Sequence, residues 1–501
     1  MIPSIRRTWR RGFRLSRGGG GRKVRDDAAR TEGKAKETRP RVFHKTYGEG
    51  TVLKVERGGM ALRVLFDRFP GLDISMPARL LRRIGGGPEP EAQRRRPHRA
   101  PSDPAEVLAL RQTIEALRLG VVPTRDLSAY TVGRDTEVEQ FRLMLSDGSR
   151  GRALALLGDY GCGKTHMLEI MQGIALDEGW VVGRAWLDPQ EAPPSQPRRV
   201  YHALARSLAY PESVEAGEQG LLPLLEACEG LELDDGTVHL FLDPAVRYAR
   251  ALAEAIQKEP GSLALGELQA LLLDWIEGRA TGLSQELGRG LSRKLGFKGK
   301  VYALSDFRTL AKVYGYMLSG LAALAQRSGK RGLLLLLDET ELFSSLGKEA
   351  RAQAAIVFRV LIAAALPAGG DASLDIADVE GGGHGAIRNL PPRFGKVSHL
   401  ALCLAATPGS ASEDFLRNTL GEKRVLELLP MMRKDFVLLS QRIRALYARA
   451  YPETPPHALS ALEDKVDQWL SRGLPGSPRE FGRKVVDFLD FCRHTHLDFA
   501  G

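Results

Sequence analysis

The residues of this chain that are best suited to chemistry form one glycine-rich stretch. They fit the pattern GxxxxGK(S/T) at every fixed position, and in order they are Gly158, Asp159, Tyr160, Gly161, Cys162, Gly163, Lys164 and Thr165, with His166 next. An apolar run at 153–157 comes before the stretch and predicts a buried strand, and residues 166–171 predict the start of a helix. Strand, glycine loop and helix are the context that a phosphate-binding loop needs. The alternative is a glycine-rich turn that fits by accident.

The chemistry expected of this loop is binding of a nucleoside triphosphate. Glycines allow backbone N–H groups to fold around a polyphosphate at a helix N-terminus, where the helix dipole favours negative charge. Lys164 can then reach the β- and γ-phosphates, and the Thr165 hydroxyl can bind Mg²⁺. The sequence therefore predicts that the loop and His166 bind the nucleotide, with ATP and Mg²⁺ as cofactors.

An acidic motif follows at 333–339, where the chain reads LLLLLDE. Five leucines without alternation predict a central parallel strand covered on both faces. The two acids then lie at the carboxyl end of that strand, where α/β sheets bind their ligands. We expect Asp338 to organise Mg²⁺ and Glu339 to activate the attacking water as a general base. The alternative is a buried helix with an acidic cap.

Two further residues are candidate sensors of the nucleotide. Residues 399–406 predict another buried strand, and Thr407 at its end suits a sensor of the γ-phosphate. Residues 476–479, which read GSPR, open a C-terminal helix and resemble the second sensor of AAA+ ATPases. That resemblance implies that Arg479 reaches the nucleotide from a helical lid. As alternatives, Thr407 is a plain strand-end cap and Arg479 a plain surface cap.

Three other arginines lie at positions where AAA+ proteins often have functional residues. The segment 132–134, Val-Gly-Arg, resembles a segment that often borders the adenine pocket, although Arg134 could equally cap a helix. Arg417 and Arg424 follow the sensor strand, where AAA+ proteins usually place an arginine finger for a neighbouring subunit. That role would require a homo-oligomer. Beyond Arg424 we expect only helices.

Composition limits the class of protein. The chain has 501 residues and is 43% apolar, so it has room for two to four domains. It has no apolar span of 18 residues, and its basic N-terminus lacks an apolar signal core. We therefore expect a cytoplasmic protein without a membrane segment. The four cysteines have no CxxC spacing, which argues against a disulfide framework and a zinc site.

The positive charge of the chain is concentrated at one end. Residues 1–104 hold 26 Lys and Arg against 11 Asp and Glu, whereas the remaining residues hold 46 against 50. The net charges are thus +15 and −4, although the whole chain carries +11. A polyanion such as nucleic acid is therefore expected to bind through residues 1–104.

The predicted fold class is α/β, a P-loop parallel sheet of the AAA+ kind with a small all-β module before it. Composition and pattern divide the chain into a disordered basic tail at 1–40, a β-rich module at 41–84, a linker at 85–104, an ATPase core at 105–430 with an all-helical insertion at about 195–330, and a helical lid at 431–501.

Two family resemblances refine this prediction. Residues 42–52 resemble the Tudor/SH3-like module of UvrD-type helicases, which implies a five-stranded barrel that docks protein or nucleic acid. Residues 105–495 resemble the ATP-binding proteins of BREX-type phage-defence loci, the BrxD-like group. The segments that carry the second resemblance are 114–123, 158–166, 187–189, 199–201, 275–278, 332–339 and 477–481.

The BREX resemblance implies an ATPase that acts with other defence proteins, often including a helicase. Two functional classes remain open: an ATP-driven motor or remodeller on DNA, and a slow nucleotide switch that recruits partners. No set of helicase motifs follows the acidic motif, which disfavours autonomous unwinding.

Overall fold

The computed structural model divides the chain into two compact units, residues 1–99 and 100–501. It describes residues 41–44, 48–56, 61–67, 73–77, 82–84, 104–123, 127–148, 151–211, 219–279, 283–297, 301–304, 311–367 and 390–495. The predicted tail at 1–40 and the linker up to residue 103 lie outside these ranges. Each unit is described by itself below.

The first unit is a five-stranded antiparallel sheet in the order β4-β3-β2-β1-β5. Its strands are β1 (Arg41–His44), β2 (Gly48–Glu56), β3 (Ala61–Phe66), β4 (Asp73–Pro77) and β5 (Arg82–Ile84). In β3, Val64 and Phe66 are buried while Arg63 is exposed, which is the alternation of a half-buried strand. The pairings leave β4 and β5 as the outer strands. Closure into a barrel stays a prediction.

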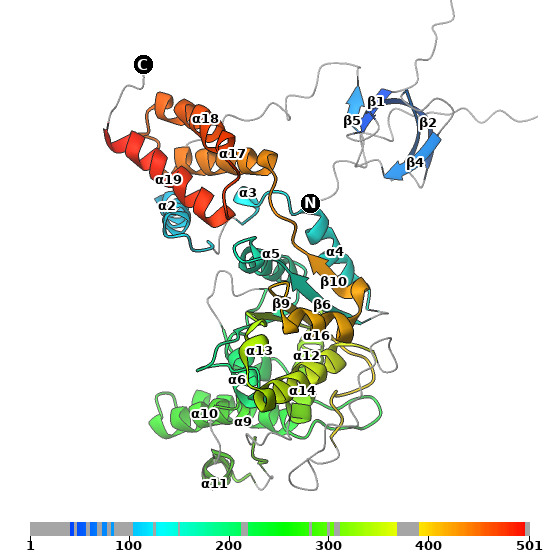
Figure 1. The fold of residues 1–501 in the computed structure, drawn as a ribbon. Coiled ribbons are helices and arrows are strands. Elements are labelled where there is room, and N and C mark those ends of the chain that lie inside the picture. Colours follow the sequence, from blue (N-terminus) through cyan, green and yellow to red (C-terminus); the bar gives the residue numbers. More distant parts are fainter. Residues whose placement is uncertain are drawn as a thin grey trace, which may run out of the picture. The chain divides into compact units, whose positions relative to one another are not determined.

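The second unit is built on a five-stranded parallel sheet in the order β10-β6-β9-β8-β7 (Figure 1). The strands are β6 (Arg152–Leu157), β7 (Val181–Trp186), β8 (Leu333–Asp338), β9 (Leu400–Ala406) and β10 (Val425–Glu427). The strand before the glycine loop, β6, is separated from the leucine strand, β8, by β9. The carboxyl ends of all three strands therefore lie at one edge of the sheet.

The leucine strand β8 is covered on both faces, as its composition predicts. Leu333, Leu335 and Leu337 belong to one hydrophobic cluster, while Leu334 and Leu336 belong to another. All five are fully buried. Because helices cover both faces of this strand, each of its leucines packs in an apolar layer, and the run needs no polar residue.

Helices cover both faces of the sheet (Figure 1). On one face lie α4 (Asp135–Ser146) and α5 (Lys164–Asp177). On the other lie α6 (Pro197–Arg206), α12 (Ala311–Arg327), α14 (Lys348–Ala365) and α16 (Ala411–Leu420). The short helix α13 (Leu342–Ser345) contacts α14 and α16.

The predicted insertion lies between β7 and β8. Besides α6 and α12 it contains α8 (Leu222–Glu226), α9 (Leu242–Lys258), α10 (Leu263–Ile276) and α11 (Leu283–Leu295). The prediction of an all-helical insertion needs one correction. Ala209 pairs with Val182 of β7 through two backbone hydrogen bonds of 2.8 and 3.0 Å. Because β7 is the outer strand of the sheet, this bridge satisfies part of its open edge.

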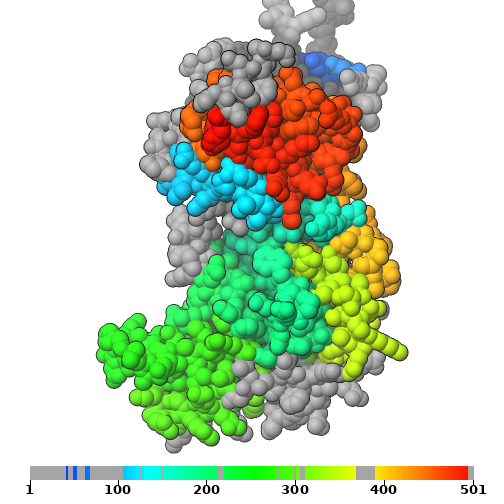
Figure 2. Space-filling view, turned by 60° about the vertical axis from the view of Figure 1, so that its left-hand side comes forward, coloured from blue at the N-terminus to red at the C-terminus, as the bar shows by residue number. Residues whose placement is uncertain are grey.

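The lid is a separate helical cluster. It comprises α17 (Arg433–Ala450), α18 (Pro456–Ser471) and α19 (Pro478–Thr495), with α2 (Pro104–Leu119) and α3 (Leu127–Tyr130) packed against α17. Figure 2 shows α2, in light blue, against the red and orange surface of these helices. The lid therefore draws its apolar core from both ends of the unit.

The expectation of helices alone beyond Arg424 is wrong. A short 3-10 helix, η5 (Glu422–Arg424), leads into β10, which pairs in parallel with β6. β10 has three residues and only Leu426 is well buried. Its sequence is therefore too short to show the alternation that predicts a strand. In the part of the chain that the structure describes, no helix is both long enough and apolar enough to cross a bilayer.

Candidate nucleotide-binding site

The glycine loop connects β6 to α5, in the context that its sequence predicts. Gly163 precedes α5 with a φ of 102°, in the left-handed region that favours glycine. At Gly158 the constraint is space, since a Cβ would lie 2.5 Å from the Cys162 Sγ. These two glycines fix the path of the loop and leave the N-terminus of α5 facing it.

Arg134 braces the loop from behind. Its guanidinium is buried and donates hydrogen bonds to the Cys162 carbonyl at 2.8 Å and the Leu429 carbonyl at 3.0 Å. An ion pair of 2.9 Å with Glu137 balances its charge. Arg134 begins α4 but makes no side-chain cap. Its side chain therefore ties the glycine loop to the segment that follows β10.

Lys164 is the first residue of α5 and is buried. Its Nζ donates to the Gly158 carbonyl and to the Thr407 Oγ1, both at 2.9 Å. The Glu341 carboxylate lies 3.8 Å from the same nitrogen. The ends of β6, β8 and β9 thus converge on one ammonium group.

Thr165 and Asp338, the two predicted metal ligands, are in direct contact. The Thr165 Oγ1 donates to the Asp338 Oδ2 at 3.1 Å, and Asp338 is almost completely buried at the end of β8. Thr165 is the second residue of α5, so its hydroxyl lies beside the loop. A hydroxyl and a carboxylate at this edge are hard oxygen donors of the kind that Mg²⁺ takes.

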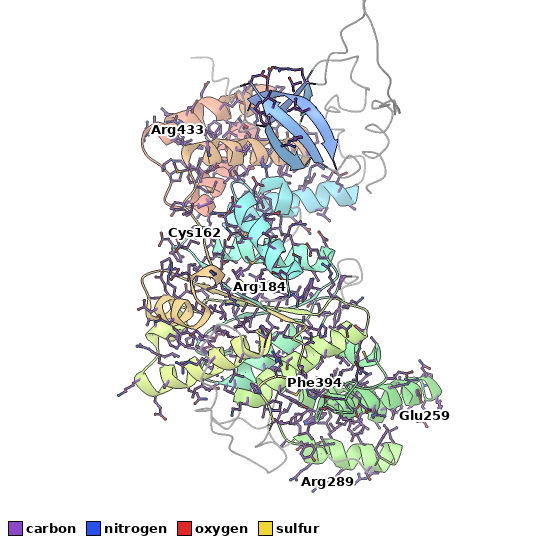
Figure 3. The ribbon with its side chains drawn as sticks, turned by 90° about the vertical axis from the view of Figure 1, so that its right-hand side faces the viewer. Cys162, Arg184, Glu259, Arg289, Phe394 and Arg433 are labelled. Atoms are coloured by element: carbon purple, nitrogen blue, oxygen red, sulfur yellow. The ribbon has the colours of Figure 1, made fainter. Side chains whose placement is uncertain are left out.

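Arg184 on β7 was not predicted and lies beside Asp338. Its guanidinium is ion-paired with Glu169 of α5 and lies 3.9 Å from the Asp338 Oδ2. The Trp186 ring covers it at 4.2 Å (Figure 3 shows Arg184 in the sheet layer). This buried guanidinium therefore places a positive charge beside the predicted metal ligand Asp338.

Glu339 has an unusual backbone. Its φ of 59° makes it the one non-glycine residue with positive φ among the residues that the structure describes. The residue lines the cavity and is solvent-accessible, although its carboxyl group is partly desolvated by the surrounding protein. This partial desolvation, followed by the nearby Glu341 and Asp338 carboxylates, raises its pKa above the ordinary value for glutamate. Residues in such strained conformations concentrate at functional sites.

The cavity beside the loop has a volume of about 330 Å³. Lys164, Thr165 and Glu339 line one end. The other end is mainly apolar, and its walls come from α2, the segment 121–132 and the lid: Leu117, Val121, Val122, Pro123, Tyr130, Val132, Met431, Leu439 and Ile443.

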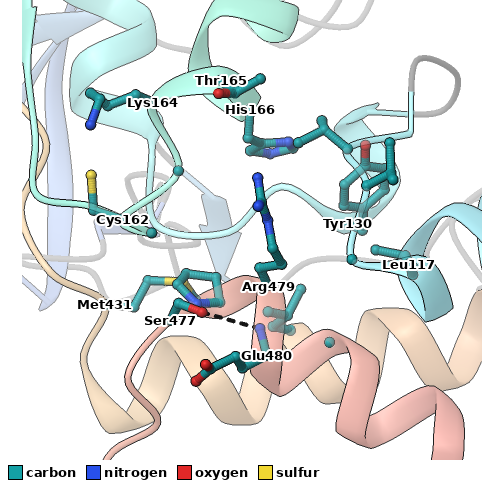
Figure 4. Close-up of a pocket in the computed structure, with 18 of the residues that line it drawn as sticks. Leu117, Tyr130, Cys162, Lys164, Thr165, His166, Met431, Ser477, Arg479 and Glu480 are labelled. Carbon is teal, nitrogen blue, oxygen red and sulfur yellow. Dashed lines mark hydrogen bonds between the residues drawn. The ribbon is translucent and has the colours of Figure 1, made fainter. Parts of the chain in front are cut away.

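Arg479 enters this cavity from the second residue of α19. Figure 4 shows its guanidinium directed toward His166, above Ser477 and Glu480. The Ser477 hydroxyl caps the helix by accepting from the Glu480 N–H at 3.1 Å. Ser477 also lies against the loop, because a Cβ added to Gly161 would be 2.9 Å from the Ser477 Cβ. The lid and the glycine loop are therefore in contact.

His166 lies at the junction of the two ends. Its Nε2 is 2.9 Å from the Thr131 Oγ1, and its ring is 5.2 Å from that of Tyr130. Burial, with a smaller contribution from Arg134, lowers its pKa to about 4. The imidazole is therefore neutral at physiological pH.

The remaining predicted residues lie in different surroundings. Asp159 and Tyr160 are exposed at the tip of the loop. Arg417 is ion-paired with Glu413, Glu422 and Glu427 of its own chain. An arginine finger at Arg417 would have to leave all three carboxylates. Arg424 donates to the Leu420 carbonyl at 3.2 Å.

A triphosphate with Mg²⁺ fits the residues at this edge. A side chain at Gly158 would meet the Cys162 Sγ, and one at Gly161 would meet the Ser477 Cβ. The two glycines therefore leave backbone N–H groups to face a ligand. Lys164 supplies positive charge, while Thr165 and Asp338 supply metal ligands. No cluster of three or more acidic, histidine or cysteine ligands for a metal occurs among the described residues.

Glu341 and the apolar walls could not be assigned from sequence. Glu341 follows the acidic motif by two residues, and a second acid there was the available signal. The walls come from segments at opposite ends of the unit, so no local pattern joins them.

The comparisons with known proteins concern the first part of this site. Residues 108–224 match the family model described as BREX system ATP-binding protein BrxC/D. No curated protein and no solved structure matches the chain. The matched segment contains most of α2, Arg134, the glycine loop and β7, but it does not reach Asp338, Thr407 or Arg479. The match makes this segment, which carries the glycine loop, similar to BREX system ATP-binding proteins.

Proposed function

We propose that this chain is an AAA+-like ATPase that binds and hydrolyses Mg-ATP. The observation that carries the proposal is the pair of contacts at the sheet edge, Lys164 Nζ to Thr407 Oγ1 at 2.9 Å and Thr165 Oγ1 to Asp338 Oδ2 at 3.1 Å. Residues at or after the carboxyl ends of β6, β8 and β9 meet there, although the two residues of each pair are 243 and 173 positions apart in the sequence. The strand order, with β9 between β6 and β8, creates that meeting point.

Each residue then has a defined role. Lys164 neutralises charge on the terminal phosphates, and Thr165 with Asp338 holds Mg²⁺. Glu339 accepts a proton from the attacking water, for which its raised pKa is suited. Thr407 contacts the γ-phosphate from β9, and Arg479 reaches the nucleotide from the lid. The apolar end of the cavity receives the base.

The proposed biological role is a DNA-associated motor or remodeller in a BREX-type defence system. Residues 1–104, with a net charge of +15, would contact nucleic acid, and other defence proteins, including a helicase, would be partners. A second candidate is a slow switch that licenses partners on DNA. The engagement of Arg417 with three carboxylates of its own chain favours this candidate, because it removes one predicted finger.

Stimulation by DNA separates the two roles. For a motor, we expect hydrolysis of ATP by the full chain to increase with duplex or single-stranded DNA, and for a switch we expect a slow rate that DNA leaves unchanged. Deleting residues 1–99 should remove most DNA affinity while keeping basal hydrolysis, since the cut follows the boundary between the units.

Salt dependence checks the same proposal by another route. Engagement of about five to eight phosphates would lower the affinity for DNA on the order of 10³-fold between roughly 50 and 200 mM salt. Equal affinity and equal salt slope in the full and truncated chains would contradict a nucleic-acid role for residues 1–104.

A further inference from the structure

Glu341 lines the cavity beside Lys164, at the phosphate end. Its Oε1 accepts a hydrogen bond from the Thr407 hydroxyl and lies 3.8 Å from the Lys164 Nζ. Lys164 in turn donates to Thr407, so the three side chains form a closed polar triangle. Neither the acidic motif nor the family match assigns this residue a role.

The turn that carries Glu341 is held firmly in place. The preceding Thr340 is fully buried, and its backbone N–H donates to the Ala405 carbonyl at 3.0 Å. The Ser412 hydroxyl donates to the Thr340 carbonyl at 3.1 Å and lies 2.9 Å from the Ser344 hydroxyl. Glu341 itself is the N-cap residue directly before α13. Its approach to Lys164 is therefore a property of the fold.

The carboxylate is only partly satisfied in this position. Its Oε2 is buried and has no hydrogen-bond partner among the described residues, whereas its Oε1 has two polar neighbours. A buried acceptor without a donor costs free energy. The side chain as a whole is 24% exposed, so it has a route away from Lys164. An anion that binds Lys164 more completely can therefore displace it.

We propose that Glu341 competes with the terminal phosphate of ATP for Lys164 and Thr407, and so sets the preference of the site between ATP and ADP. The inference rests on the proposed ATPase function and deepens it. The same two donors are the ones that a γ-phosphate would take, and a carboxylate offers similar charge and acceptors. ADP lacks the γ-phosphate and would leave the triangle intact.

The sign of the effect follows from charge. When ATP binds, the γ-phosphate either displaces Glu341 or lies beside its negative charge, and both cost affinity. ADP avoids most of that cost. Neutralising Glu341 should therefore strengthen binding of a triphosphate more than binding of a diphosphate.

The test is the substitution Glu341→Gln in the full chain. The amide keeps the size of the side chain and an acceptor for the Thr407 hydroxyl, and only the charge is lost. Kd values are measured for Mg-ADP and for the non-hydrolysable imido analogue of ATP. We expect the ratio of the ADP Kd to the analogue Kd to rise about tenfold. Glu341→Asp, which keeps the charge but retracts it, should give a smaller rise.

The matched control is Glu422→Gln, which removes the same charge from a side chain that is 72% exposed and paired with Arg417. Its ratio should equal that of the wild type. A ratio in Glu341→Gln that is unchanged or lower, with a wild-type unfolding temperature, would overturn the inference alone. If Glu341→Gln does not fold, an unchanged ratio in Glu341→Asp overturns it equally. Failure of the wild type to bind either nucleotide would overturn the proposed function as well.

Discussion

The two ends of the cavity are built in different ways. At the phosphate end, Lys164, Thr165 and Thr407 are already paired with groups of the same chain. At the opposite end the walls are mainly apolar, and the Arg479 side chain enters from the lid (Figure 4). The first end is preorganised by a sheet, and the second by helices of the lid.

This difference separates charge recognition from closure. Groups fixed at the ends of strands can stabilise a phosphate without reorganising, which is where most electrostatic benefit arises. An apolar wall supplied by a lid changes with the position of the lid. Substitutions at the phosphate end should therefore have larger effects than substitutions at the lid.

The largest effect on nucleotide affinity is expected for Lys164→Ala. Loss of the ammonium removes the main positive charge at the phosphate end and leaves Glu341 without its counter-charge. Nucleotide affinity, measured by calorimetry, should fall about 100-fold or more, which is roughly 2.7 kcal/mol. Lys348→Ala, which alters an exposed lysine of α14, is the control. Comparable affinity in both variants would place the phosphate elsewhere.

A different loss is expected for Glu339→Gln. The substitution leaves Lys164 and Thr165 in place, so ATP binding should persist while hydrolysis falls on the order of 10²- to 10⁴-fold. ATP should then remain trapped on the protein, as filter binding can measure. Normal turnover would exclude Glu339 as the base.

The pH profile gives the same residue a second readout. A general base must be ionised, and the pKa of Glu339 is raised. The rate of the wild type should therefore decrease as the pH falls, beginning above the ordinary range of a glutamate. That decrease should be absent from any residual rate of Glu339→Gln.

The smallest effect is expected for Arg479→Ala. Its guanidinium comes from the lid, so we expect ATP affinity to fall about tenfold, roughly 1.4 kcal/mol. Arg483→Ala, one turn further along α19 with a side chain that is 66% exposed, is the matched control. If the two variants bind ATP equally well, the lid end acts through its apolar wall alone.

The sequence predicted most of the phosphate end because its signals are local. The glycine pattern lies within eight residues, and residues 333–337 and 400–406 are unbroken apolar runs. The structure confirms that these two runs are strands β8 and β9, and that the run before the glycine loop is β6, of one parallel sheet. The short strand β10 was missed because three residues with one buried side chain carry no period.

The lid end could not be predicted in the same way. Its cavity wall joins Leu117 of α2 to Leu439 and Ile443 of α17, and only packing of the two ends of the unit brings them together. Arg134 shows the same limit: its position was noted, but its hydrogen bond to the Cys162 carbonyl depends on tertiary structure. Side chains that brace a site from a distance leave no local pattern.

The half-buried thiol inside the glycine loop has a practical consequence. Cys162 is intermediate in exposure, whereas Cys228, Cys403 and Cys492 are buried. Burial raises the pKa of the Cys162 thiol, so its alkylation should be slow at neutral pH, but it should still be the first of the four cysteines to react. Because Cys162 lies beside the phosphate end, the labelling rate becomes an occupancy gauge: a ligand that fills the loop shields the sulfur, and one that binds elsewhere leaves it reactive.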